Sequence, residues 1–124
     1  MVATGECICT LQHDDSLTAV CALADDRLVS GSEEGTSRVW NVATGSCDLV
    51  LDGHTGSIWG IVALSRGRIV SASEDHTLCL WSLATGARER TLRGHTAAVK
   101  YACTLADGRV VSASEDKTLR VWRL

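Results

Sequence analysis

The sequence predicts an all-β protein built from three stacked repeats, and three observations support this fold class. A histidine and a tryptophan recur with a period of 41 residues. The recurring residues are His13, His54 and His95, followed by Trp40, Trp81 and Trp122. Short β-branched runs are separated by turn residues roughly every 8–12 positions, and no segment keeps the apolar period of a helix. Repeats of roughly 20–50 residues stack because a single repeat cannot bury its own apolar face.

The elements of the middle repeat can be placed in order along the chain. Its four expected strands cover residues 48–51, 58–64, 68–73 and 77–81. Asp-Gly, Ser-Arg-Gly and Glu-Asp-His sequences separate these strands, and such residues favour turns. An Ala-Thr-Gly turn closes each repeat. We therefore expect a single propeller-like segment over residues 1–124, with repeats at approximately 2–41, 42–82 and 83–124.

Composition and charge limit the class of function. The chain has 124 residues, of which 45% are hydrophobic, and this is typical of one globular domain. A net charge of −3 without clustered lysine and arginine disfavours a nucleic-acid partner. No apolar run approaches the roughly 18 residues of a membrane span, so no membrane partner is expected. The start of the sequence lacks a basic stretch followed by an apolar core, so no secretory signal is expected.

Six cysteines occur at positions that do not follow the repeat as a set. They are Cys7, Cys9, Cys21, Cys47, Cys79 and Cys103. None forms a Cys-x-x-Cys pair, and the pattern is typical of free thiols in a reducing compartment. We therefore expect a cytoplasmic protein without a metal or another cofactor. Cys7 and Cys9 would share one face of a strand, which leaves a metal or redox role as an alternative.

The motifs of the second and third repeats resemble those of WD-repeat (β-transducin-like) proteins. Gly-His pairs at residues 53–54 and 94–95 precede Val-Ser-Ala-Ser-Glu-Asp-x-Thr-Leu-x-hydrophobic-Trp. The resemblance implies a β-propeller, with three four-stranded antiparallel units per chain arranged around a central channel. The first repeat departs from the pattern, because Gln12 precedes its histidine and Glu34 replaces the turn aspartate. No repeat has an aspartate after its tryptophan.

The resemblance also implies a hydrogen-bonded network of His, Ser, Asp and Trp in each repeat. Its members are His54, Ser71, Asp75 and Trp81, then His95, Ser112, Asp116 and Trp122, and in the first repeat His13, Ser30, Glu34 and Trp40. The carboxylate fixes the imidazole, and the hydroxyl gives the buried indole N–H a partner. The longer Glu34 predicts a looser first network. A Ser-His-Asp set also suggests a hydrolase, but a set that occurs three times without a nucleophile elbow favours a structural role, so no catalytic residue is expected.

Three blades leave a gap, because propellers have roughly four to eight. The sequence starts with an outer strand, around residues 6–11, and stops just after a third strand. We expect closure by homo-oligomerisation, in which residues 6–11 of one copy pair with residues 118–122 of the next. A trimer with nine blades is favoured over a dimer with six, because six blades compress the inner strands whereas nine only widen the channel. A fragment that needs a larger parent remains the alternative.

Family position also implies where a protein or peptide partner binds. The implied contact residues are Ser16, Thr18, Glu33, Ser57, Trp59, Glu74, Ala98, Lys100 and Glu115. Trp59 is either an exposed anchor for a partner or a packing residue between neighbouring blades. The three glutamates would form an acidic circle that attracts basic peptides, or they are solvated turn residues. The expected function is a non-enzymatic scaffold that self-assembles and presents a binding face, and the alternative is a structural or engineered propeller fragment without a ligand.

Overall fold

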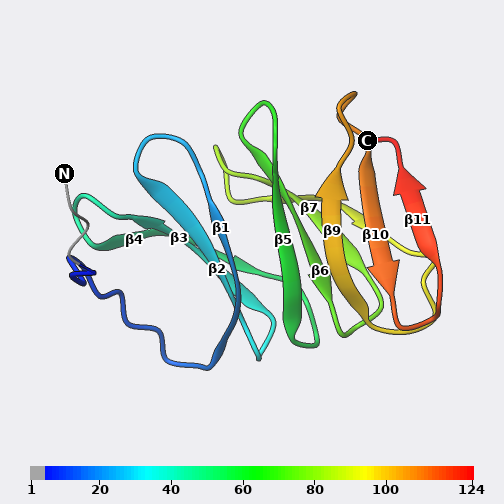
Figure 1. Ribbon diagram of the computed structural model, residues 1–124, viewed down its shortest axis with the longest axis horizontal. Coiled ribbons are helices and arrows are strands. Elements are labelled where there is room, and N and C mark those ends of the chain that lie inside the picture. Colours follow the sequence, from blue (N-terminus) through cyan, green and yellow to red (C-terminus); the bar gives the residue numbers. More distant parts are fainter. Residues whose placement is uncertain (1–4) are drawn as a thin grey trace.

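The computed structural model describes residues 5–124, which form eleven β-strands in three antiparallel sheets (Figure 1). The first sheet contains β1 (Leu17–Ala22), β2 (Arg27–Ser32), β3 (Thr36–Asn41) and β4 (Ser46–Asp52). The second sheet contains β5 (Ile58–Leu64), β6 (Arg68–Ser73), β7 (Leu78–Ser82) and β8 (Arg88–Leu92). The third sheet contains β9 (Val99–Thr104), β10 (Val110–Ser114) and β11 (Leu119–Trp122). Consecutive strands are neighbours, so each sheet is a meander of the kind expected for a blade.

Each four-stranded sheet takes its outer strand from the start of the following sequence repeat. β4 follows the Ala-Thr-Gly turn of the second repeat but pairs with β3 of the first sheet. In the same way, β8 follows the Ala-Thr-Gly turn of the third repeat but pairs with β7 of the second sheet. The strands expected at residues 58–64 and 68–73 have these bounds in the structure, as β5 and β6. Sheet and sequence repeat are therefore offset by one strand.

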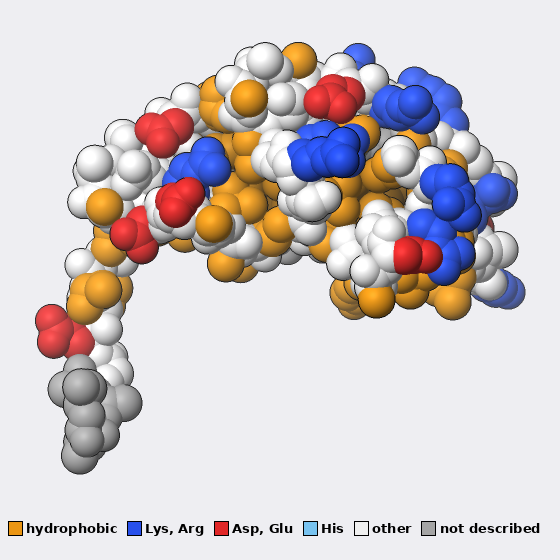
Figure 2. Space-filling model, turned by 90° about the horizontal axis from the view of Figure 1, so that it is seen from above, with side chains coloured by type: hydrophobic (Ala, Val, Ile, Leu, Met, Phe, Trp, Pro, Cys, Tyr) orange, Lys and Arg blue, Asp and Glu red, His pale blue; other side chains and the backbone are white. Residues whose placement is uncertain are grey.

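The sheets stack face to face along an arc, with β1, β5 and β9 as neighbouring inner strands (Figures 1 and 2). Two apolar cores lie between them. The first core joins the first and second sheets and contains Val29, Val39, Leu51, Ile69, Cys79, Trp81 and Leu83. The second core joins the second and third sheets and contains Val70, Ala72, Leu78, Leu80, Leu92, Val99 and Val110. The middle sheet therefore buries both of its faces, which explains its nearly continuous apolar strands.

The two end sheets each leave one apolar face open. On the first sheet, Leu17 and Val20 are exposed. On the third sheet, Tyr101, Leu119 and Val121 are exposed. Both faces belong to the stacking surfaces of the repeat, because Ile58, Leu78 and Leu80, the middle-sheet counterparts of Leu17, Leu119 and Val121, are buried.

The third sheet has three strands in the described part of the chain, in agreement with the expected strand order, and lacks the outer strand that β4 and β8 supply to the other two sheets. By the sequence repeat, residues 6–11 correspond to the outer strands β4 and β8. In the single chain these residues form no strand, because they lie at the end of the arc opposite to β11 and meet no sheet edge there (Figure 1). No helix in residues 5–124 is long and apolar enough to cross a membrane.

Candidate functional site

The second repeat holds a complete hydrogen-bonded network inside the stacked sheets. His54 lies between Ser71 and Asp75, with Nε2 at 2.7 Å from Ser71 Oγ and Nδ1 at 2.9 Å from Asp75 Oδ2. The Trp81 indole N–H donates to the same Ser71 oxygen at 2.9 Å. Thr77 completes the turn by donating its hydroxyl to Asp75 Oδ1 at 2.6 Å. Every side chain of this buried set therefore has a hydrogen-bond partner.

The electrostatics of this network favour an ion pair. Burial of the imidazole opposes protonation, but its hydrogen bonds to Asp75 and Cys79 outweigh burial and raise the pKa of His54 to about 9. Burial of the carboxyl also opposes ionisation, yet the bonds from His54 and Thr77 hold the pKa of Asp75 well below its usual range. His54 is therefore positively charged at neutral pH and donates through both ring nitrogens.

The third repeat has the same arrangement. His95 Nδ1 lies 2.8 Å from Asp116 Oδ2, and His95 Nε2 lies 2.7 Å from Ser112 Oγ. Trp122 donates its indole N–H to Ser112 at 2.8 Å. The Thr118 hydroxyl, followed by His95, lowers the pKa of Asp116.

The first repeat forms only part of the expected network. Trp40 donates to Ser30 Oγ at 2.9 Å, as its counterparts do. Both ring nitrogens of His13, however, are buried without a hydrogen-bond partner among the described residues. Asp15 accepts the backbone N–H of Glu34 at 2.8 Å, and the Glu34 carboxylate makes no hydrogen bond to His13 within residues 5–124. Burial, aided by Arg38, lowers the pKa of His13.

The expected role of His13 and Glu34 is therefore corrected, and the reason is structural. His54 and His95 follow the paired strands β4 and β8, which fix where each imidazole enters its blade. His13 follows residues 6–11, which no sheet holds in the single chain. The extra methylene of Glu34, by contrast, does not account for a histidine that lacks both of its partners.

The Ser-His-Asp geometry does not make these networks catalytic. Ser71 and Ser112 are fully buried, and the hydroxyl of each is already hydrogen-bonded to a histidine and a tryptophan. A serine that no substrate can reach cannot act as a nucleophile. In residues 5–124, no group of three or more His, Cys, Asp or Glu side chains is placed to hold a metal ion.

The implied binding residues fall at repeated positions around the inner strands. Each inner strand shifts register against its neighbour and skips one residue, and the skipped residues are Thr18, Trp59 and Lys100. Such bulges re-aim a side chain away from the regular alternation of the strand. The three residues line one cavity of about 420 Å³ with Tyr101 and Glu115, which we call the mouth cavity. Tyr101 is the residue that the sequence did not single out, and its 72% exposure marks it.

Short backbone contacts hold the acidic turns beside the inner strands. The N–H groups of Glu33, Glu74 and Glu115 donate to the carbonyls of Ser16, Ser57 and Ala98 at 2.8–2.9 Å. The Ser57 hydroxyl donates to the Glu33 carbonyl at 2.8 Å and so joins the first two sheets. Ala98 is only 2% exposed, so the structure does not present this side chain to a partner, and that expectation is corrected.

Trp59 contacts both its own sheet and the next one. Its indole N–H donates to Glu74 Oε1 at 2.9 Å, and the Lys100 ammonium lies 4.0 Å from the centroid of its ring. Lys100 Nζ is also 3.9 Å from Glu74 Oε1. Thr18 in the first sheet donates instead to the carbonyls of Gly31 and Ile58. Trp59 is therefore half-buried and bridges neighbouring sheets, while one edge of its site stays open to the mouth cavity.

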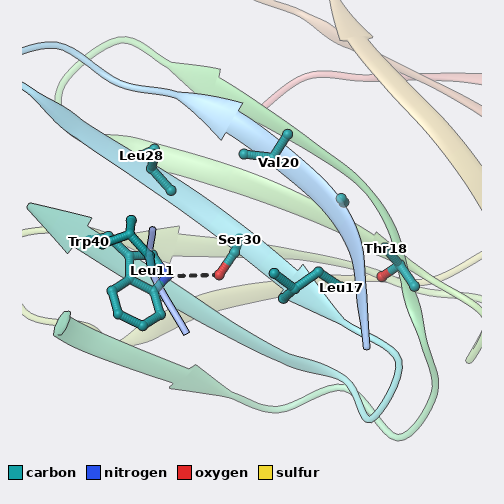
Figure 3. A pocket seen from close by; sticks show the side chains of 8 residues that line it. Leu11, Leu17, Thr18, Val20, Leu28, Ser30 and Trp40 are labelled. Carbon is teal, nitrogen blue, oxygen red and sulfur yellow. Dashed lines mark hydrogen bonds between the residues drawn. The ribbon is translucent and has the colours of Figure 1, made fainter. Parts of the chain in front are cut away.

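A second cavity, of about 440 Å³, lies on the open face of the first sheet (Figure 3). Its lining is mostly apolar and consists of Leu11, Leu17, Thr18, Ala19, Val20, Leu28, Ser30 and Trp40. Figure 3 shows Leu11 beside Trp40, whose indole is bonded to Ser30. The leading segment contributes Leu11 to this lining.

Comparisons with known proteins agree with this architecture. The chain is 42% identical over 44 residues to F-box/WD repeat-containing protein 7 of Drosophila melanogaster, which covers 36% of this chain and 3% of that protein. It is 42% identical over 57 residues to WD repeat-containing protein 86 of Homo sapiens, which covers 41% of this chain and 15% of that protein. The chain therefore spans a small part of these relatives.

Solved structures share the fold over most of the chain. The WD40 β-propeller domain of Doa1 superposes with a TM-score of 0.83 at 24% identity, over 88% of this chain and 37% of that one. The computationally designed Ika8 protein superposes with a TM-score of 0.79 at 33% identity, over 90% of this chain and 34% of that one. The family model "WD domain, G-beta repeat" matches residues 5–41, 45–82 and 86–123. With these three matches and three stacked antiparallel sheets, the chain belongs to the WD-repeat family of β-propellers.

Proposed function

We propose that this chain is a non-enzymatic protein-interaction scaffold that closes its propeller by joining copies of itself and binds basic peptides at the mouth cavity. One observation carries the assembly: apolar residues of the end sheets are exposed where their counterparts in the middle sheet are buried. Leu119 is 71% exposed, whereas Leu78, one repeat earlier, is 0% exposed. Leu17 is 51% exposed, whereas Ile58, one repeat later, is 0% exposed. Covering such side chains gains about 1.5–3 kcal/mol each.

The internal interfaces indicate which surface covers each open face. Between the second and third sheets, Val70, Leu78 and Leu80 pack with Val110 of the third sheet, and Trp122 packs against the same core. The open face of the third sheet carries the repeat counterparts of Val70, Leu78 and Leu80. The open face of the first sheet carries the repeat counterparts of Val110 and Trp122. A second copy, placed head to tail, therefore repeats an interface that the chain already makes inside itself.

Charge supports the same orientation. The segment that forms the first sheet, residues 13–52, has eight acidic and two basic residues. The segment that forms the third sheet, residues 94–124, has three acidic and five basic residues. Figure 2 shows the lysine and arginine side chains gathered toward the end of the arc that carries the third sheet. Head-to-tail contact pairs opposite charges, whereas head-to-head contact would pair like charges.

Residues 6–11 complete the proposed assembly as the outer strand of a neighbouring third sheet. β4 and β8 occupy this position in the first two sheets. Three copies give nine blades, and two copies give six. We favour the trimer, because six blades would crowd inner strands that already pack closely, whereas nine leave a wider channel.

The mass of the assembly in solution tests this proposal. Sedimentation equilibrium of the full chain is expected to give three times the chain mass, and twice that mass would assign the six-bladed ring instead. Leu119→Glu places a charge on the open face and is expected to release monomers. Ala106→Glu is the control, because Ala106 is exposed in the turn between β9 and β10, and its repeat counterparts Ala24 and Ser65 are exposed as well. A stable monomer of the unmodified chain would overturn self-assembly.

The similarity to designed Ika8 favours a second candidate, a structural or engineered propeller segment without a ligand of its own. Replacing Trp59 by alanine separates the two. The scaffold loses a bound basic peptide while its mass stays unchanged, whereas a purely structural segment binds no such peptide before or after the change.

We also propose a cytoplasmic location, because six cysteines that follow no pairing pattern suit a reducing compartment. Fractionation of cells that express the chain tests this location, and recovery from an oxidising compartment with its thiols paired would contradict it.

A further inference from the structure

The three bulge residues of the inner strands differ in chemistry, although they share one position in the repeat. Thr18 has its hydroxyl committed to two backbone carbonyls. Trp59 supplies an aromatic ring, and Lys100 supplies a cation. An aromatic ring at this position occurs once in the chain. The site formed around it therefore lies between the second and third sheets and occurs once per chain.

At this site a cation already rests on the ring. The Lys100 ammonium, from the third sheet, is 4.0 Å from the centroid of the Trp59 ring. The electron-rich face of an indole attracts cations at this distance. Glu74 accepts the indole N–H at 2.9 Å, which fixes the ring and places a carboxylate beside the cation.

The contact between Lys100 and this site is loose. Lys100 Nζ is 3.9 Å from Glu74 Oε1, which is too long for a direct hydrogen bond. The side chains of Lys100 and Glu74 are 30% and 47% exposed, so solvent competes for both. A cation held in this way can exchange with another one of similar size.

The surroundings leave room for a second cation. The mouth cavity has a volume of about 420 Å³ and reaches Tyr101 and Glu115. Tyr101 adds a second ring, and Glu115 adds a second carboxylate in the adjoining sheet. Aromatic faces with carboxylates suit the guanidinium of arginine or the ammonium of lysine, and they disfavour an anionic or apolar side chain.

We propose that Trp59 and Glu74 form a slot for one cationic side chain of a partner peptide, and that Lys100 is its internal occupant, which the partner must displace. A ligand must therefore displace Lys100 from the ring in order to bind, and a ligand without a cation has no group that can take its place. This inference rests on the proposed function of the mouth cavity as a peptide-binding site and names the group that is recognised there.

The test uses the full chain and a small probe, the acetylated and amidated tripeptide Ala-Arg-Ala. Its binding is followed by the ¹H–¹⁵N signal of the Trp59 indole, which Trp59→Leu identifies among the signals of the four tryptophans. The probe is expected to shift this signal. The same tripeptide with citrulline in place of arginine is expected to leave it unchanged, because citrulline keeps the shape and lacks the charge.

Removal of the internal occupant gives the decisive comparison. Lys100→Gln is expected to strengthen binding of the probe by about three- to tenfold, since the probe no longer competes with a stacked cation. Lys117→Gln removes the same charge two residues from Glu115 without touching the Trp59 ring, and it is expected to change the affinity by less than about twofold. Glu74→Gln is expected to weaken binding. The mass of each variant is measured in parallel, so that a loss of assembly is recognised.

The outcomes separate this inference from the proposed function. Equal strengthening by Lys100→Gln and Lys117→Gln would overturn the internal occupant, while peptide binding at the mouth cavity would stand. Equal binding of the citrulline peptide would overturn the cation slot. No shift of the Trp59 signal with the arginine peptide in any variant would overturn both the slot and peptide binding at this site.

Discussion

Replacing Ser71 by alanine probes the buried polar networks, and the chain contains its own control. Ser71 Oγ accepts one hydrogen bond from Trp81 Nε1 at 2.9 Å and another from His54 Nε2 at 2.7 Å. Ser30, at the same position of the first sheet, accepts the Trp40 indole at 2.9 Å and nothing from His13 among the described residues. The two serines therefore differ by one hydrogen bond from a charged histidine.

This difference sets the expected magnitudes. A buried donor that loses its acceptor costs about 1–3 kcal/mol, and more when it is charged. Ser71→Ala leaves two buried donors without an acceptor, one of them an imidazolium, so we expect a loss of about 3–5 kcal/mol. Ser30→Ala leaves one neutral donor, so we expect a loss of about 1–2 kcal/mol.

Urea unfolding followed by tryptophan fluorescence measures both losses. All variants are compared at one protein concentration, because the stability of an oligomer depends on concentration. The midpoint is expected to fall further for Ser71→Ala than for Ser30→Ala, with an unchanged slope. Equal losses, or a larger loss for Ser30→Ala, would refute the account in which the second network is complete and the first is not.

Three further predictions concern pH, packing and salt. Because folding raises the pKa of His54 from about 6.5 to about 9, its pair with Asp75 stabilises the fold fully below pH 6.5 and is lost as pH rises through 9. We expect the free energy of unfolding to decline by roughly 2 kcal/mol over that range, after allowance for solvent at the partly exposed Asp75. Asp75→Asn is expected to abolish this decline when urea unfolding is measured at several pH values. A decline that survives in Asp75→Asn would contradict its assignment to the pair of His54 and Asp75. Gly31→Ala is expected to destabilise the fold by about 1–3 kcal/mol, because the added carbon would lie 2.6 Å from Ile58 Cγ2. In Gly60→Ala the added carbon would meet its nearest atom at 3.4 Å, so this variant is expected to lose less stability. Thermal unfolding in which Gly60→Ala is the less stable variant would contradict the close packing of Gly31 against Ile58. Raising the salt concentration from about 0.05 to 0.5 M is expected to weaken assembly by about tenfold, because opposite charges meet head to tail, and sedimentation that is insensitive to salt would exclude the electrostatic part of the proposal.

Much of the strand pattern could be predicted from the sequence, because alternating apolar residues and turn residues are local signals. The expected strand at residues 58–64 has the bounds of β5, and the expected strand at 77–81 is displaced by one residue in β7. The motif likewise placed His54 and His95 beside their serines. Local spacing was sufficient there, because each histidine follows a paired strand that fixes its position.

The remaining features depend on contacts between sheets and could not be predicted from local spacing. His13 fits the repeat as well as His54 does, yet it lacks partners because the segment before it has no sheet edge to pair with. Ala98 occupies an implied contact position but is buried in the folded chain. The stacking of Lys100 on Trp59 joins two repeats, and nothing in either repeat alone indicates it.

Amide hydrogen exchange of residues 6–11 tests the central claim of closure by a second copy most directly. At concentrations where the chain is assembled, these amides are expected to be protected to the same degree as those of β4 and β8, and dilution is expected to remove the protection. Exchange of residues 6–11 at the rate of an unstructured chain in the assembled state would contradict strand pairing between copies.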